Sequence, residues 1–149
     1  MDYFMMQTDK HLRRLPQFQI PKEMKNIEDK KTIRDNGEVP VICVEGYNGL
    51  EIEYPDYIEK PIPLIADKFR SILKKYQPDT IFHRVMLTEK KAGVQKPYHL
   101  MVPPVIECAD PLESIYDKAG NISEFVLDAD CVQMNRIFRI KELKNQIAV

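Results

Sequence analysis

Residues 80–102, TIFHRVMLTEKKAGVQKPYHLMV, hold two apolar runs separated by a charged stretch that contains a glycine. The first run, residues 80–88, and the second, residues 96–102, are rich in the β-branched and aromatic residues that favour strands. The residues between them, 89–95 (EKKAGVQ), have the polarity and the glycine that are typical of a turn. The stretch therefore predicts an antiparallel hairpin, the clearest one in the chain.

The best helix signal comes just before this hairpin, in PIPLIADKFRSILKKYQP at residues 61–78. Apolar side chains recur there at one-, three- and four-residue steps, which places them on one helical face. These side chains are Leu64, Ile65, Phe69, Ile72, Leu73 and Tyr76. Asp67 in the first turn and two lysines in the last turn complement the helix dipole, and Pro78 ends the helix. One principal amphipathic helix is predicted over about residues 66–76.

The other strand signals are short. Residues 39–44 (VPVICV) are typical of a buried strand, and residues 50–54 (LEIEY) alternate like a half-buried one. Further strands are predicted at residues 2–7, 105–106, 124–127, 131–133 and 136–140. Many short strands beside one good helix favour an α+β fold with a mostly antiparallel sheet.

The domain organisation follows from length and from the lack of linkers. A chain of 149 residues suggests one domain, and no low-complexity tract or repeat divides it, so we expect a single domain over residues 1–149. Residues 22–37 are dense in charge and end in Asn36-Gly37, a turn signal, which predicts a solvated loop or a ragged helix.

Charge and hydropathy exclude several classes of partner. The formal net charge is −1, whereas proteins that bind nucleic acid usually carry a basic surplus, so no nucleic acid is expected. No stretch approaches the roughly 18 apolar residues of a membrane span, and no signal peptide is visible, so we expect no membrane and a cytoplasmic location. The three cysteines, Cys43, Cys108 and Cys131, are widely spaced, which predicts free buried thiols rather than a zinc site.

The chain contains no GxGxxG, P-loop, GxSxG or HExxH motif, so we expect no cofactor, no metal and no catalytic residue. His83 and His99 lie on the two arms of the predicted hairpin. Depending on the strand register they would be cross-strand neighbours, and with a third ligand they would form a metal or acid–base site. A metal-dependent hydrolase is therefore an alternative, although partly buried structural histidines explain the pattern as well.

Residues 45–59 contain five acidic residues, three tyrosines and no basic residue. Tyrosine rings supply contact area and carboxylates steer a basic partner, so this composition favours a protein interface. A solvated acidic edge, which prevents aggregation, accounts for the same composition. The candidate partner-binding residues are Glu45, Tyr47, Glu51, Glu53, Tyr54, Asp56, Tyr57 and Glu59.

Several of these stretches together resemble a family of bacterial polymorphic-toxin immunity proteins, which overlaps with a domain family of unknown function. The pattern runs through the helix stretch 61–78, Asp79, a strand at 81–87, an aromatic-bearing strand at 98–102, the step 108–110 and the Ile-Phe-Arg-Ile strand at 137–140. The opening MDYFMM matches as well. Family members continue beyond the last strand, so we expect a truncated piece or a shorter relative with an open sheet edge. Ala66 stands where a serine cap is expected.

The resemblance implies a protein that binds and neutralises a cognate toxin through non-covalent contacts. It implies no catalysis, no cofactor, and a monomer or homodimer in the bacterial cytoplasm, and it transfers no functional residue to this chain. Besides the hydrolase that uses His83 and His99, a structural or regulatory module that assembles through an exposed strand edge stays open.

Overall fold

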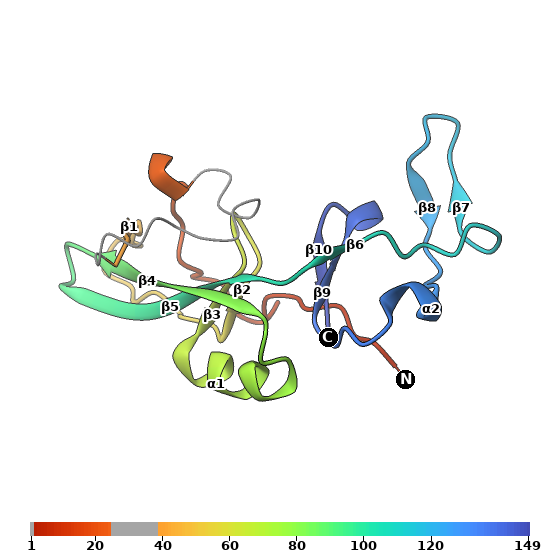
Figure 1. Cartoon of the computed structure of the whole chain (residues 1–149). Helices are drawn as coiled ribbons and strands as arrows, with labels where there is room; N and C mark the ends of the chain where they lie inside the picture. The colour runs from red at the N-terminus through yellow and green to blue at the C-terminus, as the bar shows by residue number, and fades with distance from the viewer. Residues whose placement is uncertain (1, 25–38) are drawn as a thin grey trace. The chain divides into compact units, whose positions relative to one another are not determined.

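The computed structural model describes residues 2–24 and 39–149 (Figure 1). The chain length predicts a single domain over residues 1–149. In the structure these residues group into two compact units. The sheet unit is Gln7–Val102, and the terminal unit combines Met1–Met6 with Pro103–Val149. Of the loop predicted at residues 22–37, only the 3-10 helix η1 (Lys22–Met24) is described; the Asn36-Gly37 turn lies outside the described residues.

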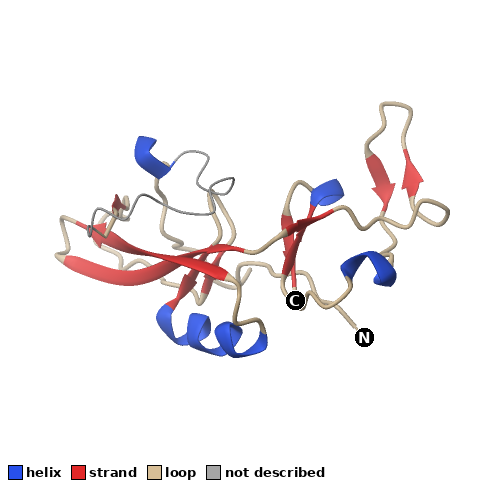
Figure 2. Cartoon of the chain, viewed as in Figure 1, coloured by secondary structure: helices blue, strands red, loops and turns tan. Residues whose placement is uncertain are grey.

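The sheet unit is built on a five-stranded sheet, and Figure 2 shows the helix α1 along one side of it. The strand order is β1-β4-β5-β3-β2, with β1 parallel to β4 and all other neighbours antiparallel. Most strands are short, as the α+β prediction requires. They are β1 (Val41–Cys43), β2 (Tyr57–Ile58), β3 (Leu64–Ala66), β4 (Ile81–Glu89) and β5 (Val94–Val102).

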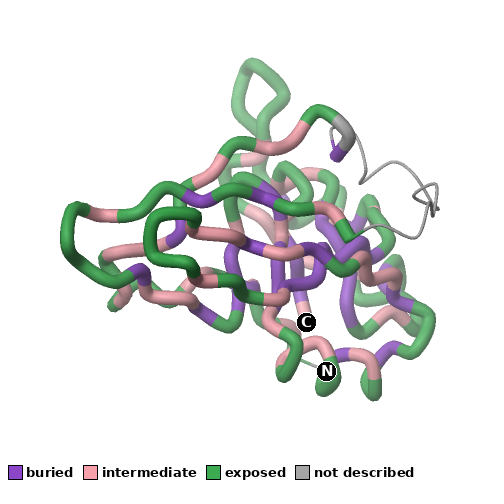
Figure 3. Tube along the Cα trace, turned by 90° about the vertical axis from the view of Figure 1, so that its left-hand side faces the viewer, coloured by how far each residue is buried: buried purple, intermediate pink, exposed green. Residues whose placement is uncertain are grey.

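The predicted hairpin is confirmed as the centre of this sheet. β4 and β5 are nine residues each and pair without a break from Ile81 opposite Val102 to Glu89 opposite Val94. Gly93 in the connecting turn has a φ of +66°, a conformation that glycine adopts without steric cost. In Figure 3, exposed residues make up the outer loops of the trace, and buried residues lie in the stretches between them.

Pairing divides the hairpin side chains between the two faces of the sheet, because residues directly opposite each other share a face. Val85 lies opposite Tyr98 and His83 lies opposite Leu100, and the apolar residues of this face belong to the main core cluster. Leu64 of β3 joins them opposite Leu100. The other face carries Arg84 and His99, and it is the face on which α1 packs.

The principal helix is confirmed as α1 (Asp67–Tyr76). Ala66 precedes it with no side-chain cap, as its sequence position indicates. The guanidinium carbon of Arg70 and the Nζ of Lys74 lie 5.7 Å and 5.6 Å from the centroid of the Phe82 ring, so the helix lies over β4. Asp67, at the start of the helix, contacts the imidazole of His99.

The predicted apolar face of the helix is partly wrong. Leu64 and Ile65 are fully buried, but they belong to β3 rather than to the helix, because they pair with β5. Within α1 only Leu73 is buried, whereas Ile72 and Tyr76 are exposed. The helix therefore buries a narrower stripe against the sheet than the full face that periodicity predicts.

Several short-strand predictions change in the structure. The stretch 39–44 contains β1, but its burial alternates, with Ile42 buried and Val41 52% exposed, because β1 is an edge strand with one covered face. Residues 50–54 form no strand, although Ile52 is buried as predicted. Residues 2–7 make only an isolated bridge at Met5, and the strand predicted at 131–133 is wrong because a short helix ends there.

The terminal unit contains a second, three-stranded sheet and a separate hairpin that projects from it (Figure 1). The strand order of the sheet is β10-β9-β6, and Met5 joins its edge by bridging Ala148. Phe138 is fully buried there, with the Tyr3 ring packed edge-on at 5.3 Å between centroids. The elements are β6 (Val105–Ile106), β7 (Ile115–Tyr116), β8 (Ile122–Glu124), α2 (Ala129–Val132), β9 (Phe138–Ile140), η3 (Lys141–Leu143) and β10 (Gln146–Ala148).

The three cysteines are free, as predicted, but only Cys108 is buried. Burial raises the pKa of the Cys108 thiol to about 11. Cys43 and Cys131 are exposed, so the prediction of three core thiols is wrong for these two. Cys43 follows the buried Ile42 on an edge strand, where alternation turns every second side chain outwards.

The central position of Leu100 gives a stability prediction. Leu100 is fully buried on the core face of β5, so Leu100→Ala leaves a cavity and is expected to lower the free energy of unfolding by about 2–5 kcal/mol. Urea unfolding followed by circular dichroism measures this. Ile72→Ala on α1, where the side chain is 45% exposed, is the control and should change stability much less. Equal losses in both variants would contradict the assigned core.

Candidate functional site

The segment that carries the predicted partner-binding residues leaves the sheet directly after β1. The Val44 amide donates to the Thr88 carbonyl at 3.0 Å, and the Glu45 amide donates to the Gln17 carbonyl at 2.8 Å. The Tyr47 hydroxyl then donates to the Leu15 carbonyl at 2.8 Å. These bonds tie residues 44–47 to the sheet on one side and to the N-terminal segment on the other.

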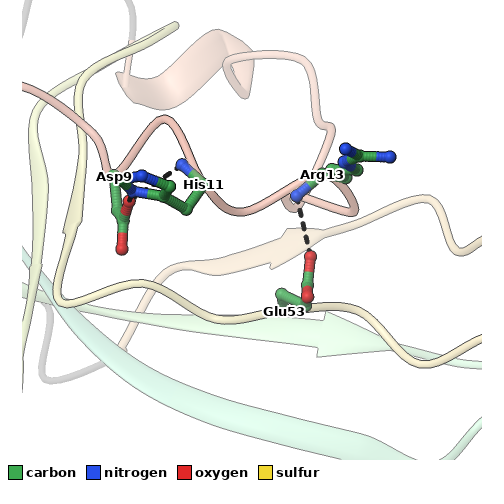
Figure 4. Close-up of polar contacts among 4 residues, drawn as sticks. All are labelled: Asp9, His11, Arg13 and Glu53. Atoms are coloured by element: carbon green, nitrogen blue, oxygen red, sulfur yellow. Dashed lines mark hydrogen bonds and ion pairs between the residues drawn. The ribbon is translucent and has the colours of Figure 1, made fainter.

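Glu53 fastens the far end of the same segment (Figure 4). One of its carboxylate oxygens accepts hydrogen bonds from the backbone amides of Arg13 and Arg14, at 2.8 Å and 2.9 Å. The Arg14 guanidinium lies 3.7 Å from the other oxygen and also donates to the Glu51 carbonyl. The amide bonds from Arg14 and then Arg13 stabilise the charged form, so they hold the pKa of Glu53 below its ordinary value.

The N-terminal segment that bonds to Glu53 also contains a local contact between Asp9 and His11, which Figure 4 shows. The Asp9 carboxylate accepts a hydrogen bond from the His11 amide at 2.9 Å and lies 3.0 Å from the imidazole Nδ1. The amide bond is the main reason that the pKa of Asp9 is lowered. His11 thus has a structural partner two residues away.

An open cleft of about 1040 Å³ lies between the segment after β1, residues 43–54, and the turn of the β4–β5 hairpin. One wall consists of residues 43–52 and Tyr54, and the other consists of residues 89–92 with Val94 and Lys96. The volume lies just above the roughly 300–1,000 Å³ that is usual for small-molecule pockets. A cleft of this size and openness can accept a segment of a macromolecule.

The two walls of the cleft carry opposite charges. Glu45 and Glu51 stand on the first wall, whereas Lys90, Lys91 and Lys96 stand on the second. Across residues 2–24 and 39–149, no ion pair within 4.0 Å joins these carboxylates to these ammonium groups. The cleft therefore presents both signs of charge, neither neutralised by a direct pair.

Tyr54 and Glu89 lie together inside the cleft. The Tyr54 hydroxyl is buried and has no hydrogen-bond partner among the described residues, while the Lys96 Nζ lies 5.6 Å from the centroid of its ring. Burial, followed by the nearby Glu89 carboxylate, raises the pKa of Tyr54. A Cβ on Gly46 would collide with the Glu89 carboxylate, so glycine at position 46 lets that carboxylate lie against the backbone of the opposite wall.

The structure brings four of the predicted partner-binding residues to the cleft and separates the other four from it. Glu45, Tyr47, Glu51 and Tyr54 line it. Glu53 instead accepts the hydrogen bonds from the Arg13 and Arg14 amides. The remaining three, Asp56, Tyr57 and Glu59, are outside the lining.

Tyr57 in particular is not available to a partner. It pairs with Ile65 in the sheet and is only 6% exposed. Tyr57 therefore packs inside the protein, on the face of the sheet that also carries His99. Composition marks the tyrosines of this segment as equivalent, and only strand pairing distinguishes them. Asp56 remains exposed, and the Glu59 amide donates to the Thr8 hydroxyl at 2.9 Å.

The sequence prediction missed Glu89 and the three lysines of the second wall. The Lys90-Lys91 pair was visible as part of a charged hairpin turn. Its relation to residues 43–54 depends on β1 lying parallel to β4, a pairing between segments more than 40 residues apart in sequence.

The hairpin register places the two candidate histidines on opposite faces of the sheet. His83 is opposite Leu100, whereas His99 is opposite Arg84, so they are not cross-strand neighbours. His83 faces the core, where burial lowers its pKa and its Nε2 has no partner among the described residues. In the described part of the chain, no three His, Cys, Asp or Glu side chains are grouped so as to hold a metal ion.

The lowered pKa of Glu53 predicts a pH-dependent contribution to stability. Because its folded-state pKa is depressed, the contribution is complete above the ordinary value of 4.5 and disappears as the pH falls through the folded-state pKa. Glu53→Gln is expected to be less stable than the wild type near pH 7, with a difference that shrinks as the pH falls below 4.5 through the folded-state pKa. Urea unfolding over this range measures the difference.

The control is Glu51→Gln, in the same segment, because the Glu51 side chain is exposed and accepts no hydrogen bond from the described residues. It should leave stability unchanged at every pH. A Glu53→Gln deficit that stays the same at every pH, down to acid in which carboxylates are protonated in the folded protein, would show that the carboxylate charge is not the cause.

Among the described residues, no helix has the length and apolar character needed to cross a membrane. Comparison with protein-family models, with curated protein sequences and with solved structures finds no match to this chain. The function is therefore inferred from the residues of the chain itself.

Proposed function

We propose that this chain is an immunity-type protein that binds a cognate bacterial toxin through non-covalent contacts, with the cleft between residues 43–54 and 89–96 at the centre of the interface. The observation that carries the proposal is an open cleft of about 1040 Å³ whose charged side chains are not paired with each other. The resemblance of the sequence to immunity proteins gives the class of partner.

The carboxylates of this segment differ in whether they are bonded within the protein, and this difference supports a binding role. The Glu53 carboxylate accepts hydrogen bonds from two backbone amides and lies beside a guanidinium. Glu45 and Glu51 are exposed and accept no side-chain hydrogen bond from the described residues. Exposed charges of this kind add little to folding but accelerate and orient association with a complementary partner.

The cleft wall is also held in place before any partner arrives. Hydrogen bonds to Thr88, Gln17 and Leu15 fix its beginning, and Glu53 fixes its end. A surface that is already ordered loses less conformational entropy on binding, which favours affinity. Inhibition by occlusion needs only such a surface, and it requires no chemistry from the immunity protein.

A protection assay tests the proposal. The chain is co-expressed in a bacterial host with each protein encoded next to its gene, and growth is measured together with complex formation by affinity purification. We expect one neighbour to be toxic, to be neutralised by this chain and to co-purify with it. Toxic neighbours that are neither neutralised nor bound, or an absence of any toxic neighbour, would count decisively against the proposal.

Variants of the first wall locate the interface. The double variant Glu45→Lys/Glu51→Lys should weaken the complex by about tenfold or more, because it reverses two charges in the cleft. The matched control is Glu124→Lys, which reverses an exposed charge on β8 in the terminal unit. Isothermal titration calorimetry gives both affinities. If the control weakens binding as much as the cleft variant does, the interface lies elsewhere.

A further inference from the structure

We infer that the cleft binds an extended segment of a partner protein that presents a basic and an acidic side chain together, rather than a uniformly basic surface. The inference rests on the proposed function in taking the partner to be a protein. The acidic composition of residues 45–59 alone predicts a basic partner. The structure adds lysines from a distant hairpin to the same cleft, and this changes the chemistry that fits.

The balance of charge in the cleft is even. Glu45, Glu51 and Glu89 are its carboxylates, and Lys90, Lys91 and Lys96 are its ammonium groups. A purely basic ligand that pairs with the first group would bring its charge close to the second group, and like charges at close range are unfavourable. A segment that carries both signs pairs with both walls.

The walls are held so that they do not neutralise each other. The first wall is tied to the sheet at Val44 and to the N-terminal segment at Glu45 and Tyr47. On the second wall, Lys96 rests over the ring of Tyr54, and the turn between the strands is closed by the Gly93 amide bonding to the Lys90 carbonyl at 3.4 Å. Opposite charges that remain apart on fixed supports are available to a ligand.

The interior of the cleft points to where each part of the segment binds. Glu89 lies against Gly46 without a hydrogen bond from the described residues, so it is placed to receive a basic side chain. The ring of Tyr54 lines the cleft and supplies contact area for the segment, while its hydroxyl is buried. Lys90 and Lys91 are exposed on the turn and suit the acidic side chain.

The direction in which one double variant changes binding affinity distinguishes a mixed-charge segment from a uniformly basic partner. Lys90→Glu/Lys91→Glu removes the attraction for an acidic side chain and makes the cleft uniformly more acidic. A mixed-charge segment should bind this variant at least tenfold more weakly, whereas a uniformly basic partner should bind it more tightly. Lys75→Glu, an exposed lysine of α1 outside the cleft, is the matched control and should leave affinity within about twofold.

A second measurement needs no identified partner. The full ¹⁵N-labelled chain is titrated with three blocked eight-residue peptides, which carry one arginine and one aspartate, the arginine alone, or the aspartate alone. We expect saturable amide shifts at residues 43–54 and 89–96 with the mixed peptide, and at least fivefold weaker binding of the other two. Gly46→Ala, which displaces the Glu89 carboxylate, should reduce binding of the mixed peptide.

The outcomes distinguish the two proposals. If a neighbouring toxin is bound and Lys90→Glu/Lys91→Glu tightens the complex or leaves it unchanged, the immunity function stands and the mixed-charge inference is overturned. If no toxin is bound but the mixed peptide binds selectively in the cleft, the inference stands and the immunity function fails. An arginine-only peptide that binds as well as the mixed one, or no shift in the cleft with any peptide, overturns the inference.

Discussion

The pairing of β4 with β5 sets the geometry on which the rest of the sheet unit depends. Nine residues on each strand are locked in one register, so each side chain is assigned to the core face or to the face under α1. A slip of one residue would exchange the two sets. This register buries Val85 and Leu100 together and places His83 and His99 on opposite faces, which removes the geometric basis for a histidine pair.

The cleft is a consequence of how the chain leaves this sheet. β1 lies parallel to β4, and the following segment departs beside the hairpin turn instead of continuing along the strand. Hydrogen bonds then tie it to the N-terminal segment. Glu53 contributes by accepting hydrogen bonds from two backbone amides. Of the two acids in residues 51–54, it is the one whose carboxylate is bonded within the protein. Folding and recognition thus use different carboxylates of the same segment.

A cleft with fixed charges of both signs has consequences for recognition. It attracts partners less strongly at long range than a uniformly acidic surface does, because the two signs largely cancel beyond the Debye length of about 10 Å. At contact it discriminates more sharply, because a ligand with the wrong arrangement leaves like charges facing each other. Such a surface suits a protein that must bind one cognate partner and ignore related ones.

Local sequence determined the features that depend on neighbouring residues. The hairpin at 80–102, the helix at 67–76 and the α+β class follow from alternation, helical periodicity and turn residues. Tertiary structure alone decided the rest. Leu64 became a strand residue because it pairs with the distant β5, Tyr57 became a buried residue because β2 pairs with β3, and Cys43 turned outwards because β1 is an edge. The lysines joined the acids in one cleft for the same reason: pairing between distant segments leaves no periodic trace in the sequence of either.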